Sequence, residues 1–338
     1  MKTKQILFTA PGIAELCEVE LKDLAPEEVL VETAVSSVSA GTERAIASGD
    51  PNISIYSSGE VRFPRSSGYS SSGTVLRVGS AVTTVAPGDR VAVSWGCHAQ
   101  HQVIRTERNV CRLPDGVGFA EAALCHIATF PMGAIRKCHL EIGESALVMG
   151  LGVLGMLAIP LLRTAGAVPI VAADPVPEKR AEALLRGADY ALDPYDPDFA
   201  KTVKELTGGG VNVAIEVTGV GAALNGVLDC MAKMGRVALL GCTRNSDFTV
   251  DYYRKVHGPG ITLVGAHTLA RPELESAPGL WTTRDDVAAL LRLMSLGRIA
   301  PSEMIAETHS PQDCGAVYAR LCREKSFPLV QFDWKNQK

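Results

Sequence analysis

The chain has 338 residues, of which 46% are hydrophobic and 21% are charged, so it is long enough for two globular domains and too apolar for a disordered protein. Its formal net charge is −4 and it contains no run of Lys or Arg, which excludes the basic surface of nucleic-acid-binding proteins. No apolar stretch reaches membrane-spanning length and the N-terminus lacks the apolar segment of a secretory signal, so we expect a cytoplasmic protein with no membrane partner.

The first part of the chain, up to about Pro114, consists of short apolar runs that Gly, Pro and Ser interrupt. Runs of this kind, separated by turn residues, predict strands. This part of the chain is therefore expected to form a β-rich domain. The predicted strands lie at 28–38, 73–82, 89–95 and 101–105.

From Ala120 the pattern changes to a helix and then to alternating strands and helices. Such alternation predicts a doubly wound parallel sheet, the Rossmann type of α/β fold. A further helix at 282–297 and a strand at 327–334 follow it. The strands predicted for the parallel sheet lie at 145–150, 169–174, 188–193, 211–219, 235–241 and 261–267.

A glycine-rich turn joins the first of these strands to a helix. Gly150, Gly152 and Gly155 form a G-x-G-x-x-G pattern, in which the glycines permit a tight turn, close approach of backbone to pyrophosphate, and close helix packing. Backbone N–H groups at the helix start can hold the phosphate charge. Asp174 ends the second strand, where a carboxylate accepts the ribose hydroxyls and repels a 2′-phosphate. The segment therefore predicts a dinucleotide site that prefers NAD to NADP.

Other residues at the same edge of the sheet are also expected to contact the cofactor. They follow the glycine-rich turn or close later strands, where backbone groups meet a bound dinucleotide. These residues are Val153, Leu154, Thr218, Gly219, Leu240, Gly241 and Gly265.

Three segments give the chain a resemblance to the medium-chain dehydrogenase/reductase superfamily. GTVLRVGSAVTTVAPGDRV (73–91) is similar to its G-x-V-x-x-V-G…G-D-R-V hairpin region, and LPDGVGFAEAAL (113–124) to its entry into the interdomain helix. Asp174 followed by Lys179 matches the acid and lysine that hold the adenosine ribose in that family. The resemblance implies a β-rich GroES-like catalytic domain and a Rossmann domain. The expected bounds are 1–126 with 269–338 for the catalytic domain and 127–268 for the Rossmann domain.

The chain departs from the zinc-dependent members of that family at their metal ligands. Ala40 stands where they have the ligating cysteine of Cys-Gly-Thr-Asp, and Tyr69 stands where they have the histidine of Gly-His-Glu. Only His126 falls where a ligand would lie, and the four-cysteine lobe of the structural zinc is missing. A catalytic zinc needs three protein ligands, so we expect no metal at either site. The segments Ser39–Glu43 and 68–73 resemble a zinc-lacking branch that includes the 2-desacetyl-2-hydroxyethyl bacteriochlorophyllide a dehydrogenase and sugar- and cyclitol-modifying relatives.

Without a metal, side chains must bind the substrate oxygen and exchange its proton. The resemblance places Thr42 where the family uses a hydroxyl to begin a proton relay. A neutral imidazole can accept an alcohol proton at physiological pH, and a phenol is the better donor. We therefore expect His126 to act as acid and base and Tyr69 to donate to the substrate oxygen. In the alternative interpretation His126 is a structural histidine bonded to backbone, and Tyr69 fills the volume that zinc occupies in relatives.

Trp95 and His267 are candidates for the substrate pocket. Trp95 falls where the family lines its pocket with an aromatic side chain, although an aromatic residue that ends a strand is also typical of core. His267 follows the sixth strand, near the expected place of the nicotinamide.

Glu43 completes the set of pocket candidates, and we expect it to be a structural partner of a nearby cation such as Arg44 rather than a catalyst. His98 and His101 have a spacing that can suggest a metal site. Because no Cys, Asp or Glu converges on them in the sequence, we interpret them as loop and strand residues.

These features predict an oxidoreductase that transfers a hydride between NAD and a secondary alcohol or ketone, without zinc. A polyol, cyclitol or sugar derivative is the expected substrate. One alternative is an NAD(P)H-dependent quinone or enone reductase, which Asp174 disfavours because those relatives prefer NADPH. Another is a non-catalytic NAD-binding protein. The resemblance also implies a homodimer that pairs through the edge of the dinucleotide-binding sheet, near 258–266, since a long edge strand must be covered or paired.

Overall fold

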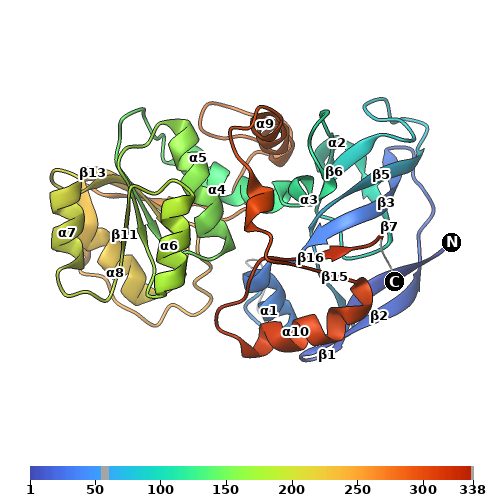
Figure 1. Ribbon diagram of the computed structural model, residues 1–338, viewed down its shortest axis with the longest axis horizontal. Helices are drawn as coiled ribbons and strands as arrows, with labels where there is room; N and C mark the ends of the chain where they lie inside the picture. Colours follow the sequence, from blue (N-terminus) through green and yellow to red (C-terminus); the bar gives the residue numbers. More distant parts are fainter. Residues whose placement is uncertain (55–60, 336–338) are drawn as a thin grey trace. The chain divides into compact units, whose positions relative to one another are not determined.

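The computed structural model describes residues 1–54 and 61–335 (Figure 1). The chain divides into two compact units. Unit 1 comprises Met1–Ile127 and Thr283–Lys338, and unit 2 comprises Ala128–Thr282. In the described part of the chain, no helix is both long enough and apolar enough to cross a membrane.

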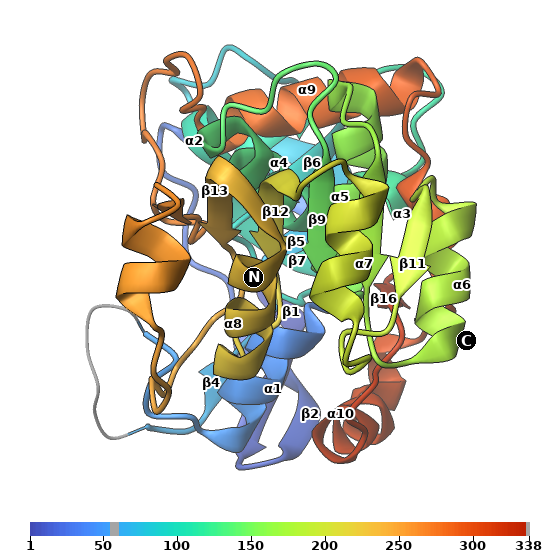
Figure 2. The ribbon, with the colours of Figure 1, turned by 90° about the vertical axis from the view of Figure 1, so that its left-hand side faces the viewer.

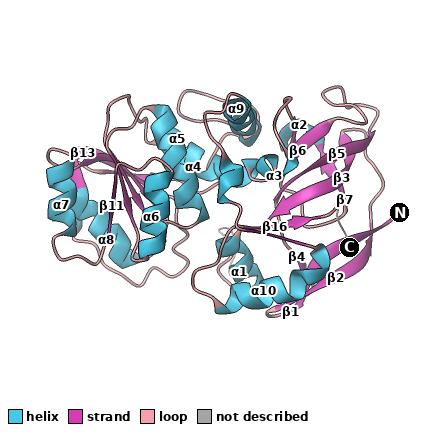
Figure 3. Cartoon of the chain, in the orientation of Figure 1, coloured by secondary structure: helices cyan, strands magenta, loops and turns pink. Residues whose placement is uncertain are grey.

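Unit 2 is built on a parallel sheet with helices on both faces (Figure 3). Its strands are β9 (Ala146–Met149), β10 (Ile170–Ala173), β11 (Tyr190–Leu192), β12 (Val211–Glu216), β13 (Met231–Leu239) and β14 (Thr262–Gly265). Its helices are α5 (Val153–Ala165), α6 (Pro177–Leu185), α7 (Phe199–Leu206), α8 (Gly221–Cys230) and the π-helix η1 (Tyr253–His257), while α4 (Cys125–Lys137) begins in unit 1.

The strand order β11-β10-β9-β12-β13-β14 is that of a Rossmann fold, so the predicted doubly wound sheet is confirmed. Successive side chains of a strand point to opposite faces. Leu147 and Met149 of β9 enter a core that α7 and α8 share, whereas Val148 lies against Gly155 of α5. Because both faces are covered, the strands contain continuous apolar runs rather than an alternating pattern.

The register of this sheet brings the carboxyl ends of its strands to one edge. Met149 at the end of β9 lies beside Ala173 of β10 and Glu216 of β12. In turn, Glu216 lies beside Leu239 of β13, and Leu239 beside Gly265 of β14. The residues that follow these strands in the sequence therefore meet at this edge.

Unit 1 is β-rich, as predicted. Its larger sheet has the order β15-β16-β3-β5-β6-β8, with β7 also paired to β3, and a smaller sheet has the order β2-β1-β4. The strands are β1 (Lys2–Ala10), β2 (Ile13–Glu20), β3 (Glu28–Ser37), β4 (Arg65–Ser66), β5 (Ser70–Val78), β6 (Arg90–Ser94), β7 (His101–Arg105), β8 (Val110–Arg112), β15 (Glu307–His309) and β16 (Val330–Asp333). The helices are α1 (Ala40–Ser48), α2 (Thr106–Asn109), α3 (Phe119–Ala122), α9 (Thr283–Ser295) and α10 (Cys314–Arg323), with 3-10 turns η2 (Pro301–Met304) and η3 (Pro311–Asp313).

The C-terminal segment completes unit 1. Strand β16 pairs antiparallel with β3, and α10 packs beside α1 (Figure 2). One buried cluster includes Phe8 of β1, Tyr318 of α10 and Phe332 of β16. Residues from both ends of the chain therefore build the core beneath α1.

The division between the units differs from the expected domain bounds at one end. The first boundary, after Ile127, is one residue from the expected position, but residues 269–282 belong to unit 2 rather than to the catalytic domain. The guanidinium carbon of Arg136 on α4 lies 3.6 Å from the ring centroid of Trp281, a cation–π contact that ties this segment to unit 2.

Candidate active site

The glycine-rich turn of unit 2 has the geometry that its three glycines predict. Gly150 has a φ of +99°, which an L side chain rarely adopts. A Cβ on Gly155 would lie 1.9 Å from the carbonyl oxygen of Gly150, so only glycine permits this approach of α5 to the turn. A Cβ on Gly152 would meet nothing within 4 Å. Gly152 therefore leaves open space at the N-terminus of α5, where backbone N–H groups can reach a phosphate.

The Asp174 carboxylate is held against this turn. Its Oδ2 accepts the backbone N–H of Leu151 at 2.8 Å, and its Oδ1 accepts that of Val176 at 2.9 Å. Lys179 Nζ lies 4.0 Å from Oδ2. Each carboxylate oxygen has two lone pairs, so the group retains acceptor sites for ribose hydroxyls. The Asp174 carboxylate and the Lys179 ammonium group therefore fit the acid and lysine of a dinucleotide site.

Glu216 organises a second turn at the same edge, and sequence analysis missed it. Its carboxylate accepts the N–H of Thr218 at 2.7 Å and that of Gly219 at 3.2 Å, and also the Thr218 hydroxyl. Its backbone carbonyl accepts the N–H groups of Leu240 and Gly241 at 2.9 and 2.8 Å. Burial raises the pKa of Glu216, and the bonds from Thr218 and Gly219 oppose that shift.

One acid thus arranges four residues that the sequence assigned to the cofactor. The available signal was an acidic residue at the end of an otherwise apolar parallel strand, directly before a Thr-Gly turn. Buried carboxylates need several donors, and a following turn supplies backbone N–H groups.

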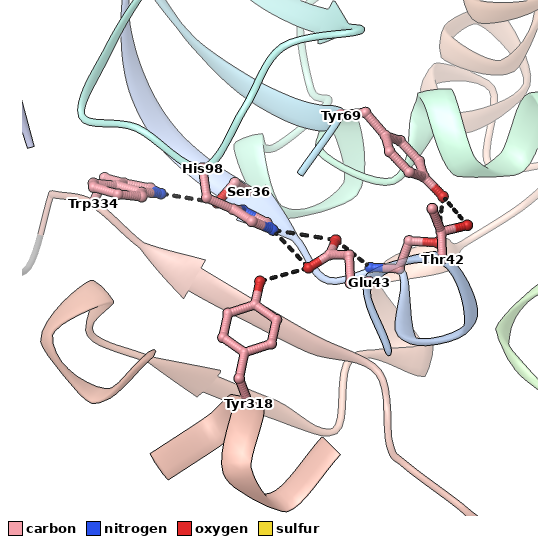
Figure 4. Close-up of polar contacts among 8 residues, drawn as sticks. Ser36, Thr42, Glu43, Tyr69, His98, Tyr318 and Trp334 are labelled. Carbon is pink, nitrogen blue, oxygen red and sulfur yellow. Dashed lines mark hydrogen bonds and ion pairs between the residues drawn. The ribbon is translucent and has the colours of Figure 1, made fainter. Parts of the chain in front are cut away.

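In unit 1, three hydroxyl side chains come together at the start of α1. The Tyr69 hydroxyl donates a hydrogen bond to Ser39 Oγ and lies 3.5 Å from Thr42 Oγ1 (Figure 4). Thr42 belongs to the first turn of α1, and Ser39 is the residue before that helix. The structure therefore joins the predicted Thr42 and Tyr69, and it adds Ser39 to them.

Tyr69 also belongs to an aromatic cluster with Trp95 and His126. The ring centroids of Tyr69 and His126 are 5.4 Å apart, and those of Trp95 and His126 are 4.6 Å apart, both edge to face. The backbone N–H of Trp95 donates to the Tyr69 carbonyl at 2.8 Å. His126 is buried, whereas Trp95 is 40% exposed and has a φ of +58°. Non-glycine residues in this conformation are uncommon and concentrate at functional sites.

Glu43 lies in the interior of unit 1. Its side chain is 0% exposed, and both oxygens accept from His98 Nε2, at 3.2 and 3.1 Å. Glu43 is therefore a buried structural partner, and it bonds to His98 rather than to the expected Arg44. The Arg44 guanidinium instead donates to the carbonyls of Leu321 and Glu324 at 2.9 and 2.7 Å.

The environment of Glu43 keeps it ionised. Burial raises its pKa, but the electrostatic interaction with His98, and hydrogen bonds from His98, Tyr318 and the Ser39 N–H, outweigh this. The pKa of Glu43 therefore lies below its usual value. Burial and the adjacent Glu43 raise the pKa of Tyr318 well above its usual value, so Tyr318 remains a donor.

His267 lies in unit 2, directly beyond β14. Its Nδ1 accepts the N–H of Leu269 at 3.2 Å, which leaves Nε2 to carry the proton of the neutral ring. Burial, with a smaller contribution from Lys137, lowers the pKa of His267. Within residues 1–54 and 61–335, no group of three or more His, Cys, Asp or Glu is placed to hold a metal ion.

Comparisons with known proteins agree with both units. The sequence matches the family models "Alcohol dehydrogenase GroES-like domain" over residues 25–138 and "Zinc-binding dehydrogenase" over residues 153–280. The D-guloside 3-dehydrogenase of Escherichia coli (strain K12) is 27% identical over 288 residues, covering 80% of this chain and 82% of that protein. The L-threonine 3-dehydrogenase of Pyrococcus horikoshii is 29% identical over 321 residues, covering 86% and 88%.

A solved structure, 2R,3R-butanediol dehydrogenase from Bacillus subtilis, superposes with a TM-score of 0.82 at 22% identity and covers 98% of this chain and 99% of that one. The two family models, the named relatives and this common fold lead to one conclusion. The chain belongs to the medium-chain dehydrogenase/reductase superfamily of alcohol dehydrogenase-like oxidoreductases.

Proposed function

We propose that the protein is a zinc-independent, NAD-dependent dehydrogenase of a secondary alcohol in the polyol, cyclitol or sugar class, or the reductase of the matching ketone. The observation that carries this proposal is the bond from Tyr69 to Ser39 beside Thr42. By the resemblance, Tyr69 stands at a position that holds a metal ligand in zinc-dependent relatives, which supports a role for hydroxyl groups in place of a metal. The matched zinc-binding dehydrogenase model covers residues 153–280 and includes none of positions 40, 69 and 126.

The chemistry assigned to these side chains replaces that of a metal. When bound, NAD supplies the hydride acceptor. In the proposed complex the Ser39 hydroxyl donates to the Tyr69 oxygen, so the single phenol proton can be donated to the substrate oxygen. That bond stabilises the charge that develops on the substrate oxygen as hydride leaves the adjacent carbon. His126, whose ring meets Tyr69 edge to face, takes up the alcohol proton, and Thr42 and Ser39 hold the phenol in place.

The proposed preference for NAD rests on Asp174. Two backbone N–H groups fix its carboxylate at the glycine-rich turn, and its remaining lone pairs suit the 2′- and 3′-hydroxyls of an adenosine ribose. A 2′-phosphate at that place would meet a negative charge. This disfavours the alternative of an NADPH-dependent quinone or enone reductase.

A homodimer through β14 is also proposed. This strand lies at the end of the six-stranded sheet and its residues are mostly exposed, as is Met234 in the adjacent β13. An exposed edge strand offers unpaired backbone groups to a second copy.

Light scattering tests the proposed dimer and should give twice the chain mass of 35.8 kDa. Leu263→Asp, which puts a charge on this edge, should shift the mass to that of a monomer, and a monomeric wild type would contradict the proposal.

Asp174→Asn tests the cofactor assignment. The amide removes the charge and one acceptor, so we expect KM for NAD to rise about tenfold or more and the discrimination against NADP to fall. Asp193→Asn is the matched control, because Asp193 shares Arg180 with Asp174 but does not bond to the turn. A wild type that uses NADPH with quinones as readily as NADH would reverse the assignment.

Tyr69→Phe and His126→Gln test the catalytic assignment. We expect kcat for alcohol oxidation to fall about 100-fold or more in each variant, because a donor to the developing charge or a proton acceptor is lost. KM for NAD should change little. Tyr195→Phe, at an exposed tyrosine of unit 2, is the control and should leave kcat unchanged. Tight NAD binding without turnover of any alcohol by the wild type would favour the non-catalytic alternative.

A further inference from the structure

Three hydrogen-bond donors from different segments converge on the buried Glu43 carboxylate. His98 Nε2 donates from the loop before β7, the Tyr318 hydroxyl donates from α10 at 2.5 Å, and the Ser39 N–H donates at 2.8 Å (Figure 4). On its other side, His98 Nδ1 lies 2.7 Å from Ser36 Oγ, which also accepts the indole N–H of Trp334.

Ser39 connects this buried network to the proposed active site. It is the N-cap residue of α1, a position where a serine hydroxyl usually accepts a backbone N–H of the first helical turn. Here the side chain makes no capping bond and instead accepts from Tyr69. Glu43 accepts the N–H of Ser39 from one residue further along the helix than the acid of a capping box. Glu43 therefore fixes the backbone of Ser39 while the Ser39 hydroxyl is left for Tyr69.

His98 also fixes the segment that carries Tyr69. The His98 N–H donates to the carbonyl of Ser67 at 2.9 Å. Its ring lies so close to Gly68 that a Cβ there would be 2.6 Å from Cδ2, and Gly68 has a φ of +85°. The His98 ring thus lies against Gly68, the residue before Tyr69, and also bonds to Glu43, which holds Ser39.

We propose that the buried His98–Glu43 pair is a positioning pair for the Tyr69–Ser39 hydrogen bond. It sets the distance between the two segments that carry these hydroxyls, and its residues touch neither substrate nor cofactor. This inference rests on the proposed role of Tyr69 as donor to the substrate oxygen.

Glu43→Gln and His98→Phe test the pair. The first keeps the shape of the acid but cannot accept from three donors, and the second keeps a ring beside Gly68 but loses the bond to Glu43. Each should lower kcat about tenfold to 100-fold and leave KM for NAD unchanged, since the pair lies in unit 1 and the glycine-rich turn in unit 2. Tyr318→Phe is the matched control, because it removes a donor to the same carboxylate and keeps both His98 and Ser39 bonded to it. It should lower Tm and leave kcat within about threefold of wild type.

A double-mutant cycle separates positioning from general destabilisation. If Glu43 acts through Tyr69, Glu43→Gln should cost nothing further in a Tyr69→Phe background. If the loss of kcat in the double variant is the product of the two single losses, the inference is overturned and the role of Tyr69 stands. The same holds if kcat falls in proportion to Tm across all variants, including Tyr318→Phe. An active Tyr69→Phe enzyme would overturn the proposed function instead.

A crystal structure of Glu43→Gln provides a readout that does not depend on turnover. The inference predicts that the Tyr69 hydroxyl and Ser39 Oγ move beyond hydrogen-bond distance, more than about 3.5 Å apart. His98→Phe serves the same purpose if Glu43→Gln does not fold. A retained Tyr69–Ser39 bond would overturn the inference.

Discussion

In unit 1, the position of α1 depends on the carboxylate of Glu43, which has no exposed surface. A buried charge is stable only where donors surround it, and Glu43 finds them in a loop, in the C-terminal helix and at the start of its own helix. These bonds tie α1 to α10 and to the loop at His98. The position of α1 in the folded protein therefore depends on the C-terminal residues, which also add β16 to the sheet beside β3.

The same arrangement gives the proposed active site its chemistry. A metal would fix substrate oxygen by coordination, and a phenol can do so only if its own position is fixed. Tyr69 is held at its hydroxyl by Ser39, beside Thr42, and at its backbone carbonyl by Trp95. In unit 2, Glu216 and Asp174 have a comparable role, because each buried acid binds backbone N–H groups of a turn that the cofactor would meet.

Much of the fold could be predicted because it follows from local patterns. Apolar strands alternating with helices predict the parallel sheet, and three glycines between a predicted strand and a predicted helix indicate the turn before α5. The second boundary of unit 2 lies after residue 282 rather than after residue 268, because tertiary contacts such as that of Trp281 with Arg136 hold the loop at 269–282 in unit 2.

The partners of Glu43 could not be predicted either, because they too are set by tertiary contacts. His98 and Tyr318 lie far from Glu43 in sequence, and a neighbouring Arg44 offered a more obvious cation. The family resemblance supplied the positions of four site residues that spacing alone could not predict. These residues are Thr42, Tyr69, Trp95 and His126. The bond from Tyr69 to Ser39 was not predicted, because the two residues lie far apart in the sequence and only the tertiary structure brings them together.

The central claim, hydride transfer to NAD without a metal, is tested most directly by assaying NADH formation before and after removal of metal ions with a chelator. The substrates should be a panel of cyclitols, sugars and secondary alcohols. The account predicts turnover that chelation leaves unchanged and that added zinc does not raise. Activity that disappears on chelation and returns with zinc would contradict it.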